Sequence, residues 1–196
     1  MTKIKICGLT RPQDIEAVNE ALPDYIGFVF APSPRRVTPL QAKELIIRLD
    51  SRIPAVGVFA NAPVEVVAAL FKDGFFDLAQ LHGDEDAAYI EDLKMRCGCA
   101  VIRAVRVQNP QQILEAQALP CDYLLLDTYQ KGVPGGTGER FDWSLIPPLS
   151  KPYFLAGGIN LQNIEEAASL SPYCLDISSG AETEGLKDPE KIKQLE

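Results

Sequence analysis

Short runs of β-branched and other apolar residues recur along the chain, and stretches with a helical repeat of apolar positions separate them. Eight such runs predict β-strands, at 3–7, 25–30, 55–59, 78–81, 100–105, 123–127, 153–156 and 175–178. Between them, apolar side chains fall three or four residues apart, as at Val64, Val67, Ala68 and Phe71. The pattern therefore predicts eight strands that alternate with helices.

Several of the predicted helices have a recognisable start. Thr10, Thr38, Asn61 and Asn109 are each followed by a proline within two residues, and Asn160 follows two glycines. Side-chain oxygens of Thr and Asn cap helix N-termini, and proline is favoured in the first turn. We therefore expect helices to begin at these five points. No low-complexity linker interrupts the alternation, so residues 1–196 are predicted to form a single domain.

Eight alternations are compatible with an open doubly wound sheet or with a closed (β/α)₈ barrel. An open sheet usually carries a glycine-rich phosphate loop after its first strand, whereas this first strand leads into Cys7-Gly8-Leu9-Thr10. Eight is also the number of strands that closes a barrel. The sequence thus predicts an α/β protein with a TIM-barrel fold, whose functional residues lie at the carboxyl ends of the strands. The last predicted helix, 188–196, is short for this fold.

Charge and composition narrow the classes of partner. The net charge of −8 argues against nucleic acid and against an anionic membrane surface. Neither a signal peptide nor an apolar run near membrane-spanning length is evident, which favours a cytoplasmic protein. The five cysteines are scattered and His82 is the sole histidine, so we expect neither a disulfide framework nor a metal site. Whether the protein is a monomer or a homodimer is left open.

Two glycine-containing loops follow the seventh and eighth predicted strands. The first contains Gly157, Gly158 and Asn160, and the second contains Ser178, Ser179 and Gly180. In barrels these loops commonly bind phosphate through backbone N–H groups. Tight turns without a ligand are the alternative for either loop alone, but both loops at these positions favour phosphate binding. A third, longer loop after the sixth strand includes Gly135, Gly136 and Gly138 and suggests a lid over a substrate, or else a plain flexible connection.

Arg35 and His82 follow the second and fourth predicted strands. A guanidinium group at Arg35 suits a substrate carboxylate, although on these residues alone two solvated surface arginines, Arg35 and Arg36, are the more common outcome. His82 is the default acid–base candidate, but contact with substrate or support of its loop is the more frequent role at such a position. Cys7 at the end of the first strand is followed by Gly8, which we expect to leave room for a ligand.

Taken in order along the chain, these segments resemble the phosphoribosylanthranilate isomerase family. The resemblance is carried by KICGLT at the first strand, GFVFAPSPRRV at the second, VGVF at the third and QLHGDE at the fourth. It continues through LLLDT, PGGTGERFDW, LAGGIN and LDISSG, up to about Asp188. No single segment is specific, because Gly-Gly and Ser-Ser-Gly occur in many phosphate-binding barrels, but the ordered combination is.

The resemblance implies a cofactor-free Amadori rearrangement in tryptophan biosynthesis. The small-molecule phosphosugar N-(5-phosphoribosyl)anthranilate would be converted into 1-(2-carboxyphenylamino)-1-deoxyribulose 5-phosphate. By the same resemblance Cys7 is the general base and Asp127 the general acid, while Arg35 holds the anthranilate carboxylate. The two glycine-containing loops would bind the phosphate, and Asp176 would help to position the substrate.

Other functions are compatible with parts of the pattern. A barrel isomerase of histidine biosynthesis performs the same rearrangement, but it resembles this chain mainly in its phosphate loops and has aspartate where Cys7 stands. A ketose-phosphate epimerase would need paired aspartates and often histidine metal ligands. A non-catalytic phosphosugar-binding barrel would have no reason to keep both Cys7 and Asp127.

Overall fold

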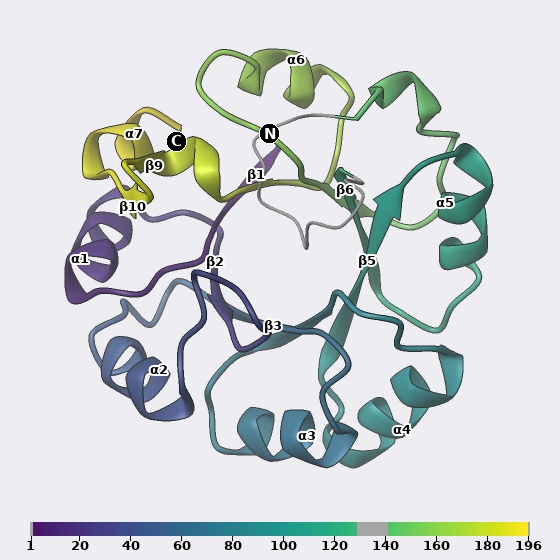
Figure 1. Cartoon of the computed structure of the whole chain (residues 1–196), viewed down its shortest axis with the longest axis horizontal. Helices are drawn as coiled ribbons and strands as arrows, with labels where there is room; N and C mark the ends of the chain where they lie inside the picture. The colour runs from purple at the N-terminus through teal and green to yellow at the C-terminus, as the bar shows by residue number, and fades with distance from the viewer. Residues whose placement is uncertain (1, 129–140, 196) are drawn as a thin grey trace.

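The computed structural model describes residues 2–128 and 141–195, and the predicted barrel is present (Figure 1). Eight parallel strands pair in chain order, and β1 closes the ring by pairing with β8, with Lys5 opposite Asp176. The strands are β1 Lys3–Cys7, β2 Tyr25–Val29, β3 Ala55–Phe59, β4 Leu78–Leu81, β5 Ala100–Val107, β6 Tyr123–Thr128, β7 Tyr153–Leu155 and β8 Cys174–Ile177. Each strand predicted from the sequence is found, with ends that differ by at most two residues.

Helices surround the ring of strands and complete the two-layered architecture (Figure 1). They are α1 Pro12–Ala21, α2 Pro39–Ile46, α3 Val64–Lys72, α4 Ala87–Cys97, α5 Pro110–Gln117, α6 Ile164–Ser169 and α7 Pro189–Leu195. Two 3₁₀ turns, η1 Trp143–Leu145 and η2 Ser179–Ala181, and a hairpin of β9 Glu182–Thr183 and β10 Leu186–Lys187 occupy the remaining connections. None of the helices within 2–128 and 141–195 has the length and apolar character needed to span a membrane.

The predicted helix starts are only partly correct. Thr38 and Asn109 cap α2 and α5 as expected, each accepting a hydrogen bond from a backbone N–H in the first turn. Thr10 does not cap α1, because Arg11 is the N-cap residue and the Asp14 carboxylate accepts the backbone N–H groups of Thr10 and Arg11, just before the helix. Asn61 is also not a cap, since α3 begins after Pro63.

Two further differences concern residues 61 and 160. Asn61 adopts a left-handed backbone conformation, with φ of 54°, and hydrogen-bonds Asp84 and Glu85 in the loop after β4. Asn160 starts a turn in which its backbone carbonyl accepts a hydrogen bond from the N–H of Ile164. The helix proper, α6, therefore begins four residues later than predicted. Both asparagines therefore shape loops at the carboxyl ends of strands rather than beginning helices directly.

Alternation along the strands divides the core into two regions. Successive side chains of a strand point to opposite faces, so Ile4 and Ile6 pack outward in the large cluster beneath the helices. The intervening Lys5 points into the barrel and is fully buried there. A smaller apolar cluster fills the lower barrel, including Tyr25 and Phe154, whose ring centroids are 5.7 Å apart.

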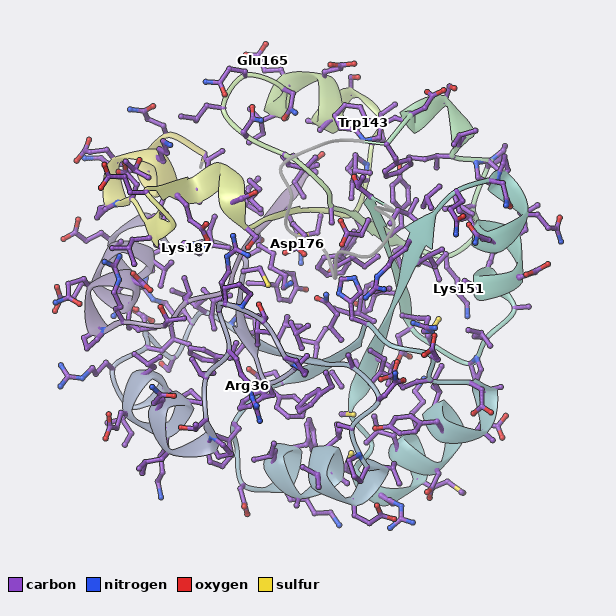
Figure 2. The ribbon with its side chains drawn as sticks, viewed as in Figure 1. Arg36, Trp143, Lys151, Glu165, Asp176 and Lys187 are labelled. Carbon is purple, nitrogen blue, oxygen red and sulfur yellow. The ribbon has the colours of Figure 1, made fainter. Side chains whose placement is uncertain are left out.

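The middle of the barrel contains a buried ionic group instead of another apolar layer. Lys5 Nζ lies 2.8 Å from Asp176 Oδ1 and 2.8 Å from Gln80 Oε1. Burial is the largest influence on Lys5 and lowers its pKa, but the nearby Asp176 and Cys7 outweigh it, so the pKa of Lys5 is raised. The ammonium group is therefore charged in the folded protein. Figure 2 shows Asp176 within the ring of strands and Glu165 at the outer edge of the molecule, on the surrounding layer of helices.

We expect Lys5→Met to lower the free energy of unfolding by about 3–5 kcal/mol, because it leaves the Asp176 carboxylate buried without its cation. The double variant Lys5→Met/Asp176→Leu, which removes both charges, should recover much of this loss. Urea denaturation followed by circular dichroism measures both quantities. A double variant no more stable than Lys5→Met would contradict the proposed origin of the effect.

Candidate active site

Every second side chain of a strand points into the barrel, and this alternation brings the predicted acid–base residues together at one end of it. Cys7 lies two residues beyond Lys5, and His82 two residues beyond Gln80, so both side chains share the inward face. Asp127 ends the inward series of β6 in the same way. Cys7 and Asp127 therefore lie at the carboxyl ends of strands 1 and 6 of the same closed ring.

The thiol of Cys7 sits in a confined and mostly buried space. On the neighbouring strand β2, a Cβ atom at Gly27 would lie only 2.7 Å from Cys7 Sγ, so glycine is needed there to admit the sulfur. Burial raises the pKa of the Cys7 thiol, and Asp176 adds to this, while Lys5 and Lys187 oppose it. Nearby cations are thus present, but they do not outweigh burial.

Asp127 is held beside His82 on the opposite side of the barrel. Its Oδ1 accepts a hydrogen bond of 2.8 Å from the backbone N–H of Thr128, and its Oδ2 lies 3.3 Å from His82 Nε2. The second contact is an approach of the two groups and not a formed hydrogen bond. Gly157 has φ of +84°, and a Cβ there would clash with Thr128 and lie 3.1 Å from Asp127 Oδ1. The glycine is therefore required for this placement of the carboxylate.

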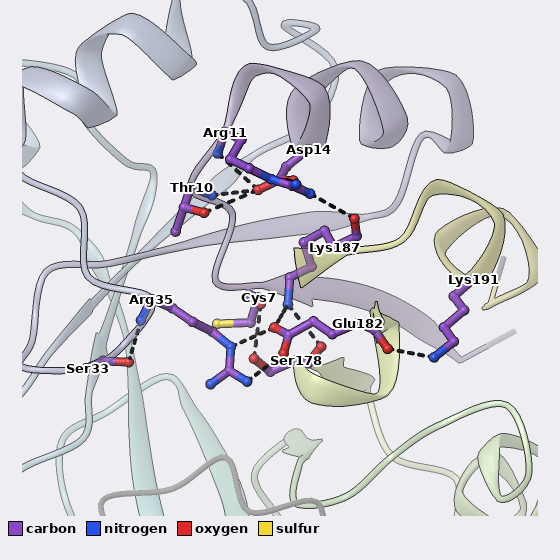
Figure 3. A network of polar contacts seen from close by, with 10 residues as sticks. All are labelled: Cys7, Thr10, Arg11, Asp14, Ser33, Arg35, Ser178, Glu182, Lys187 and Lys191. Carbon is purple, nitrogen blue, oxygen red and sulfur yellow. Dashed lines mark hydrogen bonds and ion pairs between the residues drawn. The ribbon is translucent and has the colours of Figure 1, made fainter. Parts of the chain in front are cut away.

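Arg35 is oriented by a carboxylate from the opposite end of the chain (Figure 3). Its Nε and Nη2 atoms donate to Glu182 Oε1 and Oε2 at 2.6 and 2.7 Å, which is a bidentate arrangement. Glu182 Oε1 also accepts a 2.6 Å hydrogen bond from Lys187 Nζ. Arg36, by contrast, is exposed. In the part of the chain that the structure describes, Arg35 Nη1 makes no hydrogen bond, so the outer edge of the guanidinium faces no protein acceptor there.

The space left by the missing side chain of Gly8, which was predicted to admit a ligand, is occupied by the side chain of Arg35. Gly8 has φ of +88°, and a Cβ at this position would lie 2.5 Å from Arg35 Cδ. The missing side chain therefore leaves room for the stem of Arg35, rather than directly for a ligand. Gly8 and Arg35 belong to neighbouring strand ends, so the position of the guanidinium depends on this glycine.

The two predicted phosphate loops meet at the same end of the barrel. Gly158 and Asn160 from the first loop, with Ser179 and Gly180 from the second, line a hollow of about 280 Å³ that Lys191 also borders. Gly180 is so close to the carbonyl of Ile159 that a Cβ would clash with it. The loops thus lie close together and form one surface.

Two predicted members of these loops lie outside the hollow. Gly157 packs beside Asp127 and Thr128, and the Ser178 hydroxyl donates to the carbonyl of Cys7 at 3.2 Å. Asp176 lies one layer below the strand ends, paired with Lys5 and 9% exposed. Its position suits support of the site from beneath more than open contact with a ligand.

The third loop, with Gly135, Gly136 and Gly138, lies outside the described residues. Within 2–128 and 141–195, no group of three or more His, Cys, Asp or Glu side chains is arranged to hold a metal ion.

Four charged or polar residues of the site were not identified from the sequence. Lys5 and Gln80 lie inside predicted strands whose two faces are both buried, so the local pattern does not show what a polar side chain there would contact. Glu182 and Lys187 belong to the segment ETEGLK, whose composition is that of an exposed hairpin. One signal was available: a charged residue within a barrel strand, which is covered by helices, must have a buried partner. Of these four residues, it applied only to Lys5.

A closed barrel of parallel strands, with a thiol, a carboxyl group and a guanidinium at the carboxyl ends of its strands, defines the class of TIM-barrel enzymes. The family model for N-(5'phosphoribosyl)anthranilate (PRA) isomerase matches residues 4–196. The chain belongs to this isomerase family.

Individual relatives agree with this assignment. An N-(5'-phosphoribosyl)anthranilate isomerase of Lachnoclostridium phytofermentans is 46% identical over 207 residues, covering 98% of this chain and 95% of the relative. The crystal structure of phosphoribosyl anthranilate isomerase from Thermus thermophilus superimposes with a TM-score of 0.88 at 35% identity, covering 99% of this chain and 96% of the other. A second isomerase structure, in complex with reduced 1-(o-carboxyphenylamino)-1-deoxyribulose 5-phosphate, gives a TM-score of 0.84 at 32% identity over 100% of this chain and 96% of the other.

The environment of Glu182 leads to a prediction about stability and pH. Burial alone would raise the pKa of Glu182, but Arg35 and Lys187 outweigh it and the pKa is lowered from its usual 4.5. A depressed pKa stabilises the folded state above the usual value, and this contribution is lost as the pH falls through the folded pKa. We expect Glu182→Gln to cost on the order of 3 kcal/mol of unfolding free energy at pH 7.

The difference between parent and Glu182→Gln should then shrink as the pH is lowered below 4.5. Urea denaturation at a series of pH values measures it. Glu190→Gln, at an exposed position of α7, is the matched control and should have little effect at any pH. A Glu182→Gln penalty that is constant across the pH series would contradict the assignment.

Proposed function

We propose that this chain isomerises N-(5-phosphoribosyl)anthranilate to 1-(2-carboxyphenylamino)-1-deoxyribulose 5-phosphate, with Cys7 as general base and Asp127 as general acid. The observation that carries this proposal is the presence of both side chains on the inward face at the carboxyl ends of β1 and β6. Membership in the isomerase family supports the choice of reaction.

The first step opens the sugar ring. Asp127 gives its proton to the furanose oxygen while the bond between that oxygen and C1 breaks. The lone pair of the anthranilate nitrogen forms the C1=N bond, so the intermediate is an iminium and Asp127 becomes a carboxylate. The backbone N–H of Thr128, 2.8 Å from Oδ1, stabilises that charge.

The second step moves a proton from carbon. The Cys7 thiolate removes the proton from C2, and the electron pair forms a C1=C2 double bond as the iminium nitrogen is neutralised. The resulting enaminol becomes the ketone when the hydroxyl proton is lost and a proton is added at C1. Burial, which raises the pKa of Cys7, makes its thiolate a stronger base. Lys5 and Lys187 supply the positive potential that favours ionisation of the thiol.

Two charged ends hold the substrate over these groups. The outer edge of Arg35, which Glu182 orients, is suited to bidentate binding of the anthranilate carboxylate. The hollow lined by Gly158, Asn160, Ser179 and Gly180 suits the phosphate, since glycines let an anion approach the backbone closely and Lys191 lies at its border. His82 beside Asp127 and Asp176 beneath the site complete the proposed set.

The histidine-pathway isomerase is a weaker alternative, because it has aspartate in place of Cys7. A non-catalytic phosphosugar-binding barrel is also weaker, because it would have no reason to keep both Cys7 and Asp127. We further propose that the enzyme acts in the cytoplasm as a monomer or homodimer. The acidic composition and the biosynthetic character of the family support the proposed location.

Substitution of the two acid–base residues tests the mechanism. Cys7→Ser and Asp127→Asn should each lower kcat by about 10²-fold or more, because each removes one proton-transfer group. Steady-state kinetics with N-(5-phosphoribosyl)anthranilate measures the loss, and circular dichroism verifies folding. The matched controls are Cys97→Ser and Asp92→Asn, both on α4 and away from the barrel mouth. Full activity of Cys7→Ser would remove the base from this mechanism.

Inorganic phosphate tests the proposed phosphate hollow. It should inhibit competitively, and Gly180→Ala should raise both its inhibition constant and the KM by about tenfold, because the added Cβ meets the Ile159 carbonyl and separates the two loops. The thermal unfolding midpoint of the variant should be recorded alongside. Inhibition that is not competitive, or a KM unchanged in a folded Gly180→Ala variant, would place the phosphate elsewhere.

A further inference from the structure

A continuous row of polar side chains runs through the barrel from the buried lysine to the proposed acid. Lys5 Nζ lies 2.8 Å from Gln80 Oε1, and Gln80 Nε2 lies 3.3 Å from His82 Nδ1. On the other side of the imidazole, His82 Nε2 lies 3.3 Å from Asp127 Oδ2. The four residues come from β1, β4, the loop after β4, and β6.

The chemistry of Lys5 determines how the Gln80 amide is oriented. An ammonium group has three N–H donors and no acceptor, so it can face only the carbonyl oxygen of the amide. The amide NH₂ group must then face His82. Lys5 is fully buried and Gln80 is 2% exposed, so both groups are shielded from bulk water.

The oriented amide in turn determines which nitrogen of His82 carries the proton. Gln80 Nε2 is a donor, and the His82 Nδ1 that faces it must be the acceptor. In a neutral imidazole the proton is then on Nε2, the atom that faces Asp127 Oδ2. A proton on Nδ1 would set two N–H groups against each other.

We propose that Gln80, oriented by Lys5, is a positioning residue that holds His82 in the Nε2–H tautomer beside the general acid Asp127. This inference rests on the proposed function for the part played by Asp127, whereas the tautomer itself follows from the contacts alone. Gln80 and Lys5 do not touch the reacting atoms and act through His82.

The tautomer has a direct chemical consequence for proton transfer. With the proton on Nε2, the imidazole N–H stabilises the Asp127 carboxylate that remains after the furanose oxygen has been protonated. With the proton on Nδ1, the bare Nε2 would accept the acid's own proton and compete with the substrate for it. At 3.3 Å the His82 Nε2–Asp127 Oδ2 contact is not a formed hydrogen bond, and general-acid contacts commonly tighten when the reacting group binds.

The presence of one histidine allows the tautomer to be observed directly. In uniformly ¹⁵N-labelled, untagged protein, a long-range ¹H–¹⁵N correlation spectrum contains the imidazole signals of His82 alone. We would record it without substrate at about pH 8, above the usual titration range of histidine. The parent should show the proton on Nε2, and a parent spectrum with the Nδ1–H tautomer would overturn the proposal.

Gln80→Glu replaces the donor that faces His82 Nδ1 with an acceptor while conserving the shape of the side chain. One carboxylate oxygen keeps the contact with Lys5, and the other now presents an acceptor to His82 Nδ1, which should become protonated. Gln80→Met removes the amide without supplying an acceptor and should leave a mixture of tautomers, which also covers the case in which the Glu variant does not fold. Gln194→Glu, exposed on α7, is the matched control and should leave the His82 signals unchanged.

Kinetics on the same variants tests the catalytic part. Gln80→Glu should lower kcat by about tenfold or more and leave KM within about twofold, since no substrate contact is lost. An unaltered tautomer in folded Gln80→Glu, or an unaltered kcat despite a reversed tautomer, would overturn the positioning role. Failure of the proposed function gives a different result, namely full activity in Asp127→Asn with the His82 tautomer still dependent on residue 80.

Discussion

The buried ammonium group of Lys5 is the constraint on which the upper half of the barrel depends. A charge removed from water must be paired and hydrogen-bonded, and Lys5 obtains this from Asp176 and Gln80 at 2.8 Å each. These contacts tie β1 to β8 and to β4 across the barrel. They also set the layer directly beneath Cys7 and His82, because Cys7 lies two residues beyond Lys5 in β1 and His82 lies two residues beyond Gln80, just after β4.

A second ionic cluster performs a related task at the barrel mouth. Glu182 is a counter-ion for both Arg35 and Lys187, so the segment that follows β8 is attached to the loop that follows β2 (Figure 3). Gly8 leaves space for the Arg35 stem, and Gly157 leaves space for Asp127. The proposed reaction site therefore relies on groups that do not themselves react. They orient the guanidinium and the carboxyl group before a substrate arrives.

Much of the fold was predictable because its signals are local. Eight apolar runs with helical spacing between them predicted eight strands and the closed barrel, and Thr38 and Asn109 were correctly predicted as caps. Thr10 and Asn61 were wrong for a specific reason. Arg11 caps the helix in place of Thr10, and Asp14 accepts the backbone N–H groups of Thr10 and Arg11. Asn61 is bound by Asp84 and Glu85 of the loop after β4. A cap motif cannot reveal such competing partners.

The sequence by itself determined the alternation of strands and helices, the family, and the strand ends at which Cys7, Asp127 and the glycine loops stand, since these follow from patterns within a few neighbouring residues. Only the tertiary structure decided that Lys5 points inward to Asp176, 171 residues away, and that Arg35 is held by Glu182, 147 residues away. Both faces of a barrel strand are buried, so a charged residue there needs a partner of opposite charge, and the local sequence does not show which distant residue that is. That partner becomes its neighbour only when the ring closes.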